Sequence, residues 1–285
     1  MENAVINRAT QKIDVNDFRT LTQLHIKYEW LQEEPDALFE LWCLADREEQ
    51  KRLIEFLIHN FLYINGKDLD HGCKSIVNQI EIEWGLTATN TIITATCDNS
   101  NPDGSQMILQ KIKNKLSGYW REKMLYNSLP VAANELQKNY NIVLIDDFIG
   151  TGDTICKKVK YLLETLHNRK IEDYSIYIVS LAAMNFAKEP MNELNIPYYS
   201  VHWLLKGISE KMNLTERANA IKAMEDLEAK LKDKVFGRKL LNFGYKRSES
   251  LFALESNNIP NNVFPIFWWT HLKDNTLRKT LFHRI

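Results

Sequence analysis

The sequence has few cysteines, no long apolar run and almost no net charge, and each scarcity excludes a class of protein. Its four cysteines (Cys43, Cys73, Cys97 and Cys156) are scattered over 285 residues, and no two of them form a C-x-x-C pair. This spacing argues against a zinc site or a disulfide framework and indicates reduced thiols. The chain must therefore fold on a hydrophobic core, for which an apolar fraction of 45% is ordinary.

The lack of long apolar segments argues against a membrane protein. No stretch is long and apolar enough to span a bilayer, and the N-terminal segment MENAVINRATQKIDVND has no apolar run like that of a signal peptide. We therefore expect a cytoplasmic protein with no membrane partner. A formal net charge of −1 argues against binding nucleic acid over the whole surface, and leaves a local basic patch open.

The most informative part of the chain is the segment 141–154, NIVLIDDFIGTGDT. Its aliphatic run, 142–145, is typical of a strand covered on both faces of a parallel sheet. Two adjacent acids, Asp146 and Asp147, follow at the carboxyl end of that strand, where ligands bind in such sheets. A short glycine- and threonine-containing loop and an amphipathic helix pattern complete a strand, loop and helix unit.

The chemistry of this segment suits a phosphorylated ribose. Ionised Asp146 and Asp147 are acceptors for two sugar hydroxyls. The glycines let the backbone turn tightly, and loop amides, threonine hydroxyls and the first N–H groups of the helix can converge on one phosphate. The phosphate-binding candidates are Gly150, Thr151, Gly152, Asp153 and Thr154. An ATPase Walker B strand would need a G-x-x-x-x-G-K-[ST] loop, which the chain lacks, and a purely structural strand and turn stays open.

Residues 146–154 resemble the phosphoribosyl-diphosphate (PRPP) motif of the type I phosphoribosyltransferases. That motif has two acids, two apolar residues, any residue and then Thr-Gly-any-Thr, and every position is filled here. The resemblance implies that Asp146 and Asp147 hold the ribose hydroxyls, act in catalysis and bind Mg²⁺, the implied cofactor. It implies that residues 150–154 hold the 5′-phosphate. It also implies an α/β fold, with a parallel sheet flanked by helices.

The pattern along the chain divides it into three expected parts. These are a helical N-terminal region (1–85), a phosphoribosyltransferase-like α/β core (86–205) and a helical, hood-like C-terminal extension (206–285). Strand and helix patterns alternate through the core, which argues for a parallel sheet. We expect a loose polar arm before residue 29, helical structure over 33–64 and 68–84, strands at 89–96, 174–181 and 198–203, and a long helix over 214–239.

The loop 97–105, CDNSNPDGS, follows the first expected strand. In the resembled family this loop contacts pyrophosphate, so the candidates are Asp98, Asn99, Ser100, Asp103 and Gly104. The loop departs from the usual pattern of a small residue beside a basic one or a glycine, because it is acidic and rich in amides. Asp98 and Asp103 would supply oxygen ligands if pyrophosphate is bound through Mg²⁺. A plain surface turn is the alternative.

The family also places a mobile, basic catalytic loop between the next helix and the PRPP motif. In this chain that segment is 113–140, and by position alone Lys115 and Arg121 are the catalytic candidates within it. The alternative is a solvated helix face, with aromatic residues packed beneath it.

The tail contains two features that bear on function. A basic stretch indicates either a solvated face or a surface for nucleic acid or phosphate; its members are Lys230, Lys232, Lys234, Arg238, Lys239, Lys246 and Arg247. Further on, Asn261, Asn262 and Trp268 are candidates for binding a base, because amides read base edges and aromatic rings stack on bases. The alternative is a turn followed by aromatic residues that fill a core.

The segments 243–245 (FGY), 260–262 (PNN) and 265–268 (PIFW) resemble a C-terminal extension of phosphoribosyltransferase-like proteins of bacterial conflict systems, including ones encoded beside retron reverse transcriptases. This implies an anti-phage effector that binds PRPP or a nucleotide and carries out glycosyl transfer or nucleotide cleavage. A reverse transcriptase with its nucleic acid, or another defence protein, is the implied partner, and a homo-oligomer is left open. A nucleotide-sensing regulator without catalysis and a structural subunit of a nucleoprotein complex are the alternatives.

Overall fold

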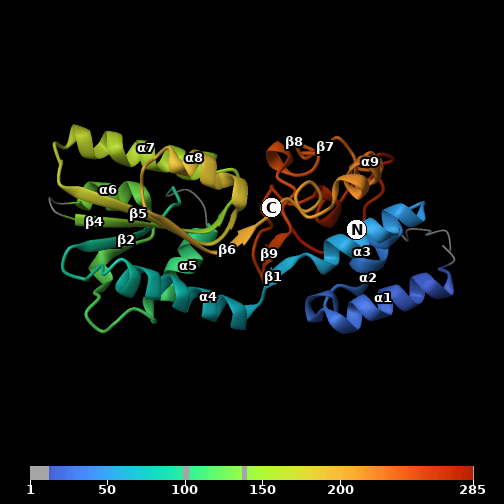
Figure 1. Ribbon diagram of the computed structural model, residues 1–285, viewed down its shortest axis with the longest axis horizontal. Coiled ribbons are helices and arrows are strands. Elements are labelled where there is room, and N and C mark those ends of the chain that lie inside the picture. Colours follow the sequence, from blue (N-terminus) through green and yellow to red (C-terminus); the bar gives the residue numbers. More distant parts are fainter. Residues whose placement is uncertain (1–12, 99–102, 137–139, 285) are drawn as a thin grey trace, which may run out of the picture.

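The computed structural model describes residues 13–98, 103–136 and 140–284. Along its longest axis the molecule has two parts (Figure 1). One contains the main sheet and its helices, residues 65–204, and is called the core lobe here. The other is built from both ends of the chain, residues 13–61 and 205–284, and is called the terminal lobe. Blue N-terminal helices and red C-terminal segments lie together in it.

The core lobe is built on a parallel sheet of five strands in the order β3-β2-β4-β5-β6. The long aliphatic strands occupy the centre, where both faces are buried, as the run 142–145 predicts. The pairing places Ala95, Ile145 and Val179 side by side, so β2 ends beside the residue that precedes the acid pair, while β4 and β5 continue beyond it. The strands are β2 (Thr91–Ala95), β3 (Leu125–Tyr126), β4 (Tyr140–Ile149), β5 (Tyr174–Met184) and β6 (Tyr198–Leu204).

Helices cover both faces of this sheet (Figure 1). One face packs against α4 (Gly66–Asn78) and α5 (Gly104–Lys113), and the other packs against α6 (Leu129–Glu135), α7 (Asp153–Asn168) and α8 (Lys188–Asn192). The result confirms the predicted α/β class with a helix-flanked parallel sheet. The short helical turns of this lobe are the π-turn η2 (Gln79–Glu83) and the 3₁₀ turns η3 (Glu122–Met124) and η4 (Asn185–Ala187).

The terminal lobe has one hydrophobic core made from both chain ends. Rings from the C-terminal segment fill it, with Phe243, Phe264 and Phe267 fully buried. Its helices are α1 (Val15–Lys27), α2 (Pro35–Trp42), α3 (Glu48–His59) and α9 (Leu214–Glu228), with the 3₁₀ turns η1 (Glu29–Leu31), η5 (Tyr245–Arg247) and η6 (Pro265–Phe267). A small hairpin is formed by β7 (Lys234–Val235) and β8 (Arg238–Lys239).

A short parallel ladder joins the two lobes. β1 (Leu62–Ile64), from the N-terminal half, pairs with β9 (Phe252–Leu254), from the C-terminal extension. The ring of Phe252 stacks on that of Phe148 in β4, with centroids 4.8 Å apart and planes 10° from parallel. Because Phe148 directly follows Asp147, this contact ties the terminal lobe to the strand that carries the acid pair.

Three local predictions were wrong. The expected arm contains α1, because Asp14 caps a helix by accepting N–H bonds from its first turn. Residues 62–64 form a strand and not the end of a helix, because β9 supplies their hydrogen-bond partner. The helix expected to reach Lys239 ends at Glu228, and the hairpin β7–β8 follows it.

The three-part division of the chain stays a prediction, although buried side chains group differently from it. α4 packs with the sheet, and α1–α3 share a core with the C-terminal extension. Among the described residues, no helix has both the length and the apolar character needed to cross a bilayer.

The terminal lobe buries the carboxyl group of Glu228, the last residue of α9, completely. Both of its oxygens accept the backbone N–H of Phe243, at 3.0 Å each. Burial raises the pKa of Glu228 to about 8, and that N–H bond and the nearby Arg247 offset the effect only partly. Glu228 is therefore protonated in much of the folded protein at neutral pH.

The variant Glu228→Gln is expected to change how stability depends on pH. Between the ordinary pKa of 4.5 and about 8, only the folded state keeps the Glu228 proton. This contribution to the free energy of unfolding is complete below pH 4.5. It falls as pH rises through the window, by at most about 1.4 kcal/mol per pH unit. In urea denaturation from pH 4 to 9, the wild-type value minus the Glu228→Gln value should decline up to pH 8 and then level off. A flat difference would contradict the buried-acid interpretation.

Candidate functional site

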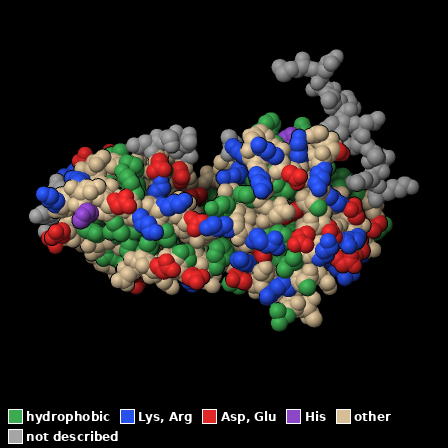
Figure 2. All heavy atoms as spheres, turned by 90° about the horizontal axis from the view of Figure 1, so that it is seen from above, with side chains coloured by type: hydrophobic (Ala, Val, Ile, Leu, Met, Phe, Trp, Pro, Cys, Tyr) green, Lys and Arg blue, Asp and Glu red, His purple; other side chains and the backbone are tan. Residues whose placement is uncertain are grey.

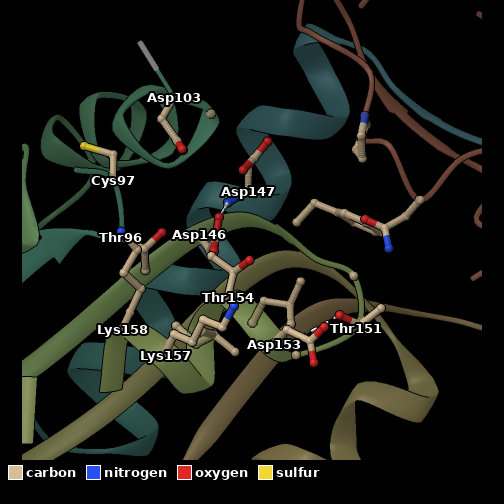
Figure 3. Close-up of a pocket in the computed structure, with 18 of the residues that line it drawn as sticks. Thr96, Cys97, Asp103, Asp146, Asp147, Thr151, Asp153, Thr154, Lys157 and Lys158 are labelled. Carbon is tan, nitrogen blue, oxygen red and sulfur yellow. Dashed lines mark hydrogen bonds between the residues drawn. The ribbon is translucent and has the colours of Figure 1, made fainter. Parts of the chain in front are cut away.

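A cleft of about 940 Å³ lies at the carboxyl end of β4, between the two lobes. The core lobe contributes the acid pair, the loop 150–154 and the first turns of α7, which Figure 3 shows around one space. The terminal lobe contributes the opposite wall, formed by Tyr245, Asn258, Pro260, Asn261, Asn262 and Arg284. The segment singled out by its sequence therefore lines this cleft.

The loop 150–154 connects β4 to the N-terminus of α7. Gly152 is the residue before the helix and has φ +83°, a left-handed conformation that glycine adopts at little cost. The N–H of Asp153 donates to Thr151 Oγ1 at 3.4 Å, which holds the loop against the first helical turn. Helix N-termini carry unpaired N–H groups and a partial positive charge. All five loop residues line the cleft, so the loop has the features of a phosphate site.

The terminal lobe packs directly onto this loop. A Cβ added at Gly150 would overlap the side-chain amide of Asn262, so the two residues can meet only because residue 150 is glycine. Asn262 Nδ2 donates to Ser248 Oγ at 2.8 Å, which fixes the amide in place. At the other end of the loop, Asp153 forms an ion pair with Lys246 at 2.5 Å. The extension thus forms part of the site wall.

Three acids converge at the end of the cleft beside β2. Asp146 and Asp147 come from β4, and Asp103 is the N-cap of α5, where its Oδ1 accepts the N–H of Ser105 at 2.8 Å. Oxygen atoms of the three carboxylates all lie within 4.8 Å of one another (Figure 3). Gly104 permits this approach, because a Cβ there would overlap the carboxyl group of Asp147.

The acid cluster concentrates negative charge at a partly buried position. Burial, followed by the charge of Asp147, holds the pKa of Asp146 well above its usual range. Burial also raises the pKa of Asp147 to about 6, and the charge of Asp103 adds to this. Across the described ranges, no lysine or arginine forms an ion pair with any of the three. A set of oxygen ligands with uncompensated charge fits a hard divalent cation such as Mg²⁺.

Some predicted site residues lie elsewhere. Lys115 forms an ion pair with Asp70 of α4, and the guanidinium of Arg121 donates to the carbonyl oxygens of Gly118 and Trp120. Neither basic residue lines the cleft. Within the described residues 114–136, no lysine or arginine lines the cleft beside the acid cluster.

Two further predictions are resolved by burial and pairing. Trp268 is only 6% exposed and donates its indole N–H to the Val263 carbonyl at 3.0 Å, so it is a core residue and not part of the cleft. Asp98 lines the cleft but forms an ion pair with Lys158. Asn99 and Ser100 lie outside the described residues.

The sequence analysis missed several residues of the cleft. Lys157 and Lys158 follow Thr154 at helical spacing, so the 3.6-residue period places them on the same side of α7, and that signal was available. Tyr245 and Arg284 reach the cleft from distant parts of the chain, and no local pattern predicts them. Tyr245 Oη lies 3.5 Å from a carboxylate oxygen of Asp153.

An acid pair and a phosphate-type loop at the end of a central parallel strand define an α/β protein of the phosphoribosyltransferase class. The family model PRTase-CE matches residues 29–284, and the chain belongs to that family. No curated protein matches the sequence.

Solved structures resemble the chain at low similarity. One is a hypothetical protein from Neisseria gonorrhoeae with bound ppGpp, which is 13% identical over 57% of this chain and 97% of that one, with a TM-score of 0.35. Another is an HGPRT-ase from Leishmania tarentolae in complex with GMP, which is 15% identical over 51% of this chain and 82% of that one, with a TM-score of 0.34. A third is an orotate phosphoribosyltransferase from Aeropyrum pernix, which is 17% identical over 46% of this chain and 68% of that one, with a TM-score of 0.31. The assignment rests on the family match.

The variant Gly104→Ala is expected to weaken divalent-cation binding. Its added methyl group would displace the carboxyl group of Asp147 and open the acid cluster, with little change in stability because a side chain can rotate away. Loss of one ligand position should reduce Mg²⁺ affinity, measured by calorimetry, about tenfold or more. The control is Gly118→Ala, since nothing lies within 4 Å of a Cβ there. Equal affinities in the two variants would show that the cluster does not bind the ion.

Proposed function

We propose that the protein binds PRPP or a ribonucleotide in this cleft. The 5′-phosphate would lie on loop 150–154, and the ribose hydroxyls would be held by Asp146 and Asp147. The observation that carries the proposal is that the acid pair and the phosphate-type loop lie next to each other at the end of β4 and line the same cleft. The terminal lobe forms the wall opposite them, where the base would lie.

The acid cluster supports Mg²⁺ as the cofactor. Asp103, Asp146 and Asp147 would hold the ion. Burial first, and then the charges of neighbouring acids, raise the pKa values of Asp146 and Asp147, and a bound cation would favour their ionised forms. When bound, Mg²⁺ neutralises the negative charge of pyrophosphate. Because the pKa of Asp147 is about 6, its carboxyl group is largely ionised at neutral pH and is able to accept a sugar hydroxyl.

The chemistry that this arrangement supports is transfer at the anomeric carbon. The bond from C1′ to pyrophosphate breaks and a bond from C1′ to a base nitrogen forms, or the reverse occurs with a nucleotide. The transition state is cation-like, so catalysis rests on positioning and on charge stabilisation. Here the loop amides would hold the phosphate, and the two carboxylates would orient the sugar and stabilise its developing positive charge.

The double variant Asp146→Asn/Asp147→Asn tests the proposal. It removes both charges with little change in volume, so it should weaken PRPP binding in the presence of Mg²⁺ by about 100-fold, measured by calorimetry. Asp173→Asn is the matched control, since Asp173 is exposed in the loop after α7. The proposal fails if the double variant binds PRPP and ribonucleotides as the wild type does, or if the wild type binds neither.

A second candidate is a nucleotide-sensing regulator without catalysis. The observation in its favour is that Lys115 and Arg121 are held by other contacts and do not reach the cleft. Binding of radiolabelled PRPP without release of pyrophosphate, over a panel of bases, would favour the regulator. Turnover would favour the enzyme.

The biological role that we propose is that of a retron-type anti-phage effector acting on nucleotides. Its partner would be a reverse transcriptase with its nucleic acid, or another defence protein. The support is the resemblance of the segments 243–245 and 260–262, which include residues of the cleft wall. Expression without a partner should then be toxic and should alter the cellular nucleotide pool by mass spectrometry. Expression of Asp146→Ala/Asp147→Ala should be harmless, and toxicity of both proteins would count against this role.

A further inference from the structure

The hairpin β7–β8 presents an aromatic ring to solvent. Its two strands are joined by Phe236 and Gly237 alone, and the side chain of Phe236 is 91% exposed. The ring makes an edge-to-face contact with that of His271, with centroids 5.5 Å apart and an angle of 87° between the planes. The ring is therefore held out from the surface of the terminal lobe.

Three properties of the hairpin work against stability. Phe236 has φ +48° and Gly237 has φ +82°, so a bulky residue occupies a left-handed position that favours Asn, Asp or Gly. Lys234 pairs directly with Lys239, which places like charges opposite each other. The exposed ring also gains almost nothing from burial. Local features that destabilise the fold, with no stabilising contact to offset them, indicate a functional surface.

The hairpin is also strongly cationic. Segment 232–239 has four cations (Lys232, Lys234, Arg238 and Lys239) and one acid, Asp233. Lys234, Arg238 and Lys239 are exposed, and none of these three has an ion pair within the described part of the chain. The protein as a whole carries a net charge of −1, so this positive charge is local.

The cationic surface continues to the cleft. Arg238 donates from its guanidinium to the backbone carbonyl of Arg284 at 3.2 Å, and Arg284 lines the cleft. Burial lowers the pKa of Arg284, and the nearby positive charge of Arg238 lowers it further, so the two guanidinium groups repel each other. An anion near both would relieve this repulsion. Figure 2 shows Lys and Arg side chains gathered on this face of the terminal lobe, beside the hollow between the lobes.

We propose that the hairpin binds single-stranded nucleic acid. A base would stack on the ring of Phe236, and the phosphates would lie along Lys234, Arg238 and Lys239, leading the strand toward Arg284 at the cleft. Aromatic stacking platforms flanked by cations are the usual means of binding single strands without sequence preference. The proposal does not depend on the function proposed for the cleft.

A nucleic acid fits this surface better than an anionic membrane does. Within the described residues 229–284, only Phe236 and Leu277 are large apolar side chains that are mostly exposed. Two such side chains offer little area for insertion into lipid. The positive charge of the hairpin is continued to the cleft by the contact of Arg238 with Arg284, and a chain of phosphates can follow such a series of cations.

The test is binding of fluorescently labelled dT20 and U20 to the full chain, followed by anisotropy over a range of salt concentrations. Phe236→Ala should weaken binding about fivefold to 100-fold, because it removes the stacked ring. Arg238→Glu/Lys239→Glu should weaken binding more, and should flatten the plot of log affinity against log salt by about one unit or more.

Matched controls lie on the core lobe. Tyr119→Ala removes another exposed ring, 82% exposed, and Lys67→Glu/Lys170→Glu reverses two exposed lysines outside the hairpin. Both controls should bind the oligonucleotides as the wild type does. All variants replace exposed side chains, so their melting temperatures should stay close to the wild-type value.

Three results would overturn the proposal. They are no oligonucleotide binding by the wild type, binding that the hairpin variants leave unchanged, and hairpin-dependent binding to phosphatidylserine vesicles in place of oligonucleotides. The cleft is tested separately. Asp146→Asn/Asp147→Asn should keep oligonucleotide binding, and the hairpin variants should keep PRPP binding, so failure of one proposal is distinct from failure of the other.

Discussion

The contact between Gly150 and Asn262 is the constraint on which the rest of the site depends. It brings the C-terminal extension onto the loop at the end of β4, and it is possible only because residue 150 has no side chain. The Asp153–Lys246 ion pair and the stacked rings of Phe148 and Phe252 hold the same two lobes together on either side of it. The cleft thus lies between the core lobe and the C-terminal extension, and most of its candidate sugar- and phosphate-binding residues come from the segment 146–154.

The acid cluster shows how function and stability oppose each other in this fold. Asp103, Asp146 and Asp147 are brought together with no ion pair to a lysine or arginine among the described residues. Burial, with the charges of neighbouring acids added to it, raises the pKa values of the last two. Such a cluster destabilises the protein by itself. A bound cation relieves the repulsion between the carboxylates, so the cluster favours cation binding. The hairpin β7–β8 follows the same logic, because its paired lysines and exposed Phe236 oppose folding and suit an anionic, stacking partner.

The two proposed sites, the cleft and the hairpin, would hold two kinds of phosphate on adjoining surfaces. The cleft has enclosed acids and a helix N-terminus, which suit one sugar phosphate that is coordinated and oriented. The hairpin is open and cationic, which suits a chain of phosphates bound with little geometric demand. Arg284 lies where the two surfaces meet, since it lines the cleft and its backbone carbonyl accepts a hydrogen bond from Arg238 of the hairpin.

The sequence by itself determined β4, the loop 150–154 and the start of α7, because aliphatic runs, glycines and helical periodicity act over a few residues. It also placed Asp103 and Gly104 in a relevant loop. It misplaced Lys115 and Trp268, whose partners Asp70 and Val263 are set by packing between elements. Only the tertiary structure decided that Asn262 packs against the loop 150–154, that Arg284 reaches the cleft and that Phe236 is exposed to solvent. Contacts between residues far apart in the chain depend on how whole elements pack, and no local pattern records that packing.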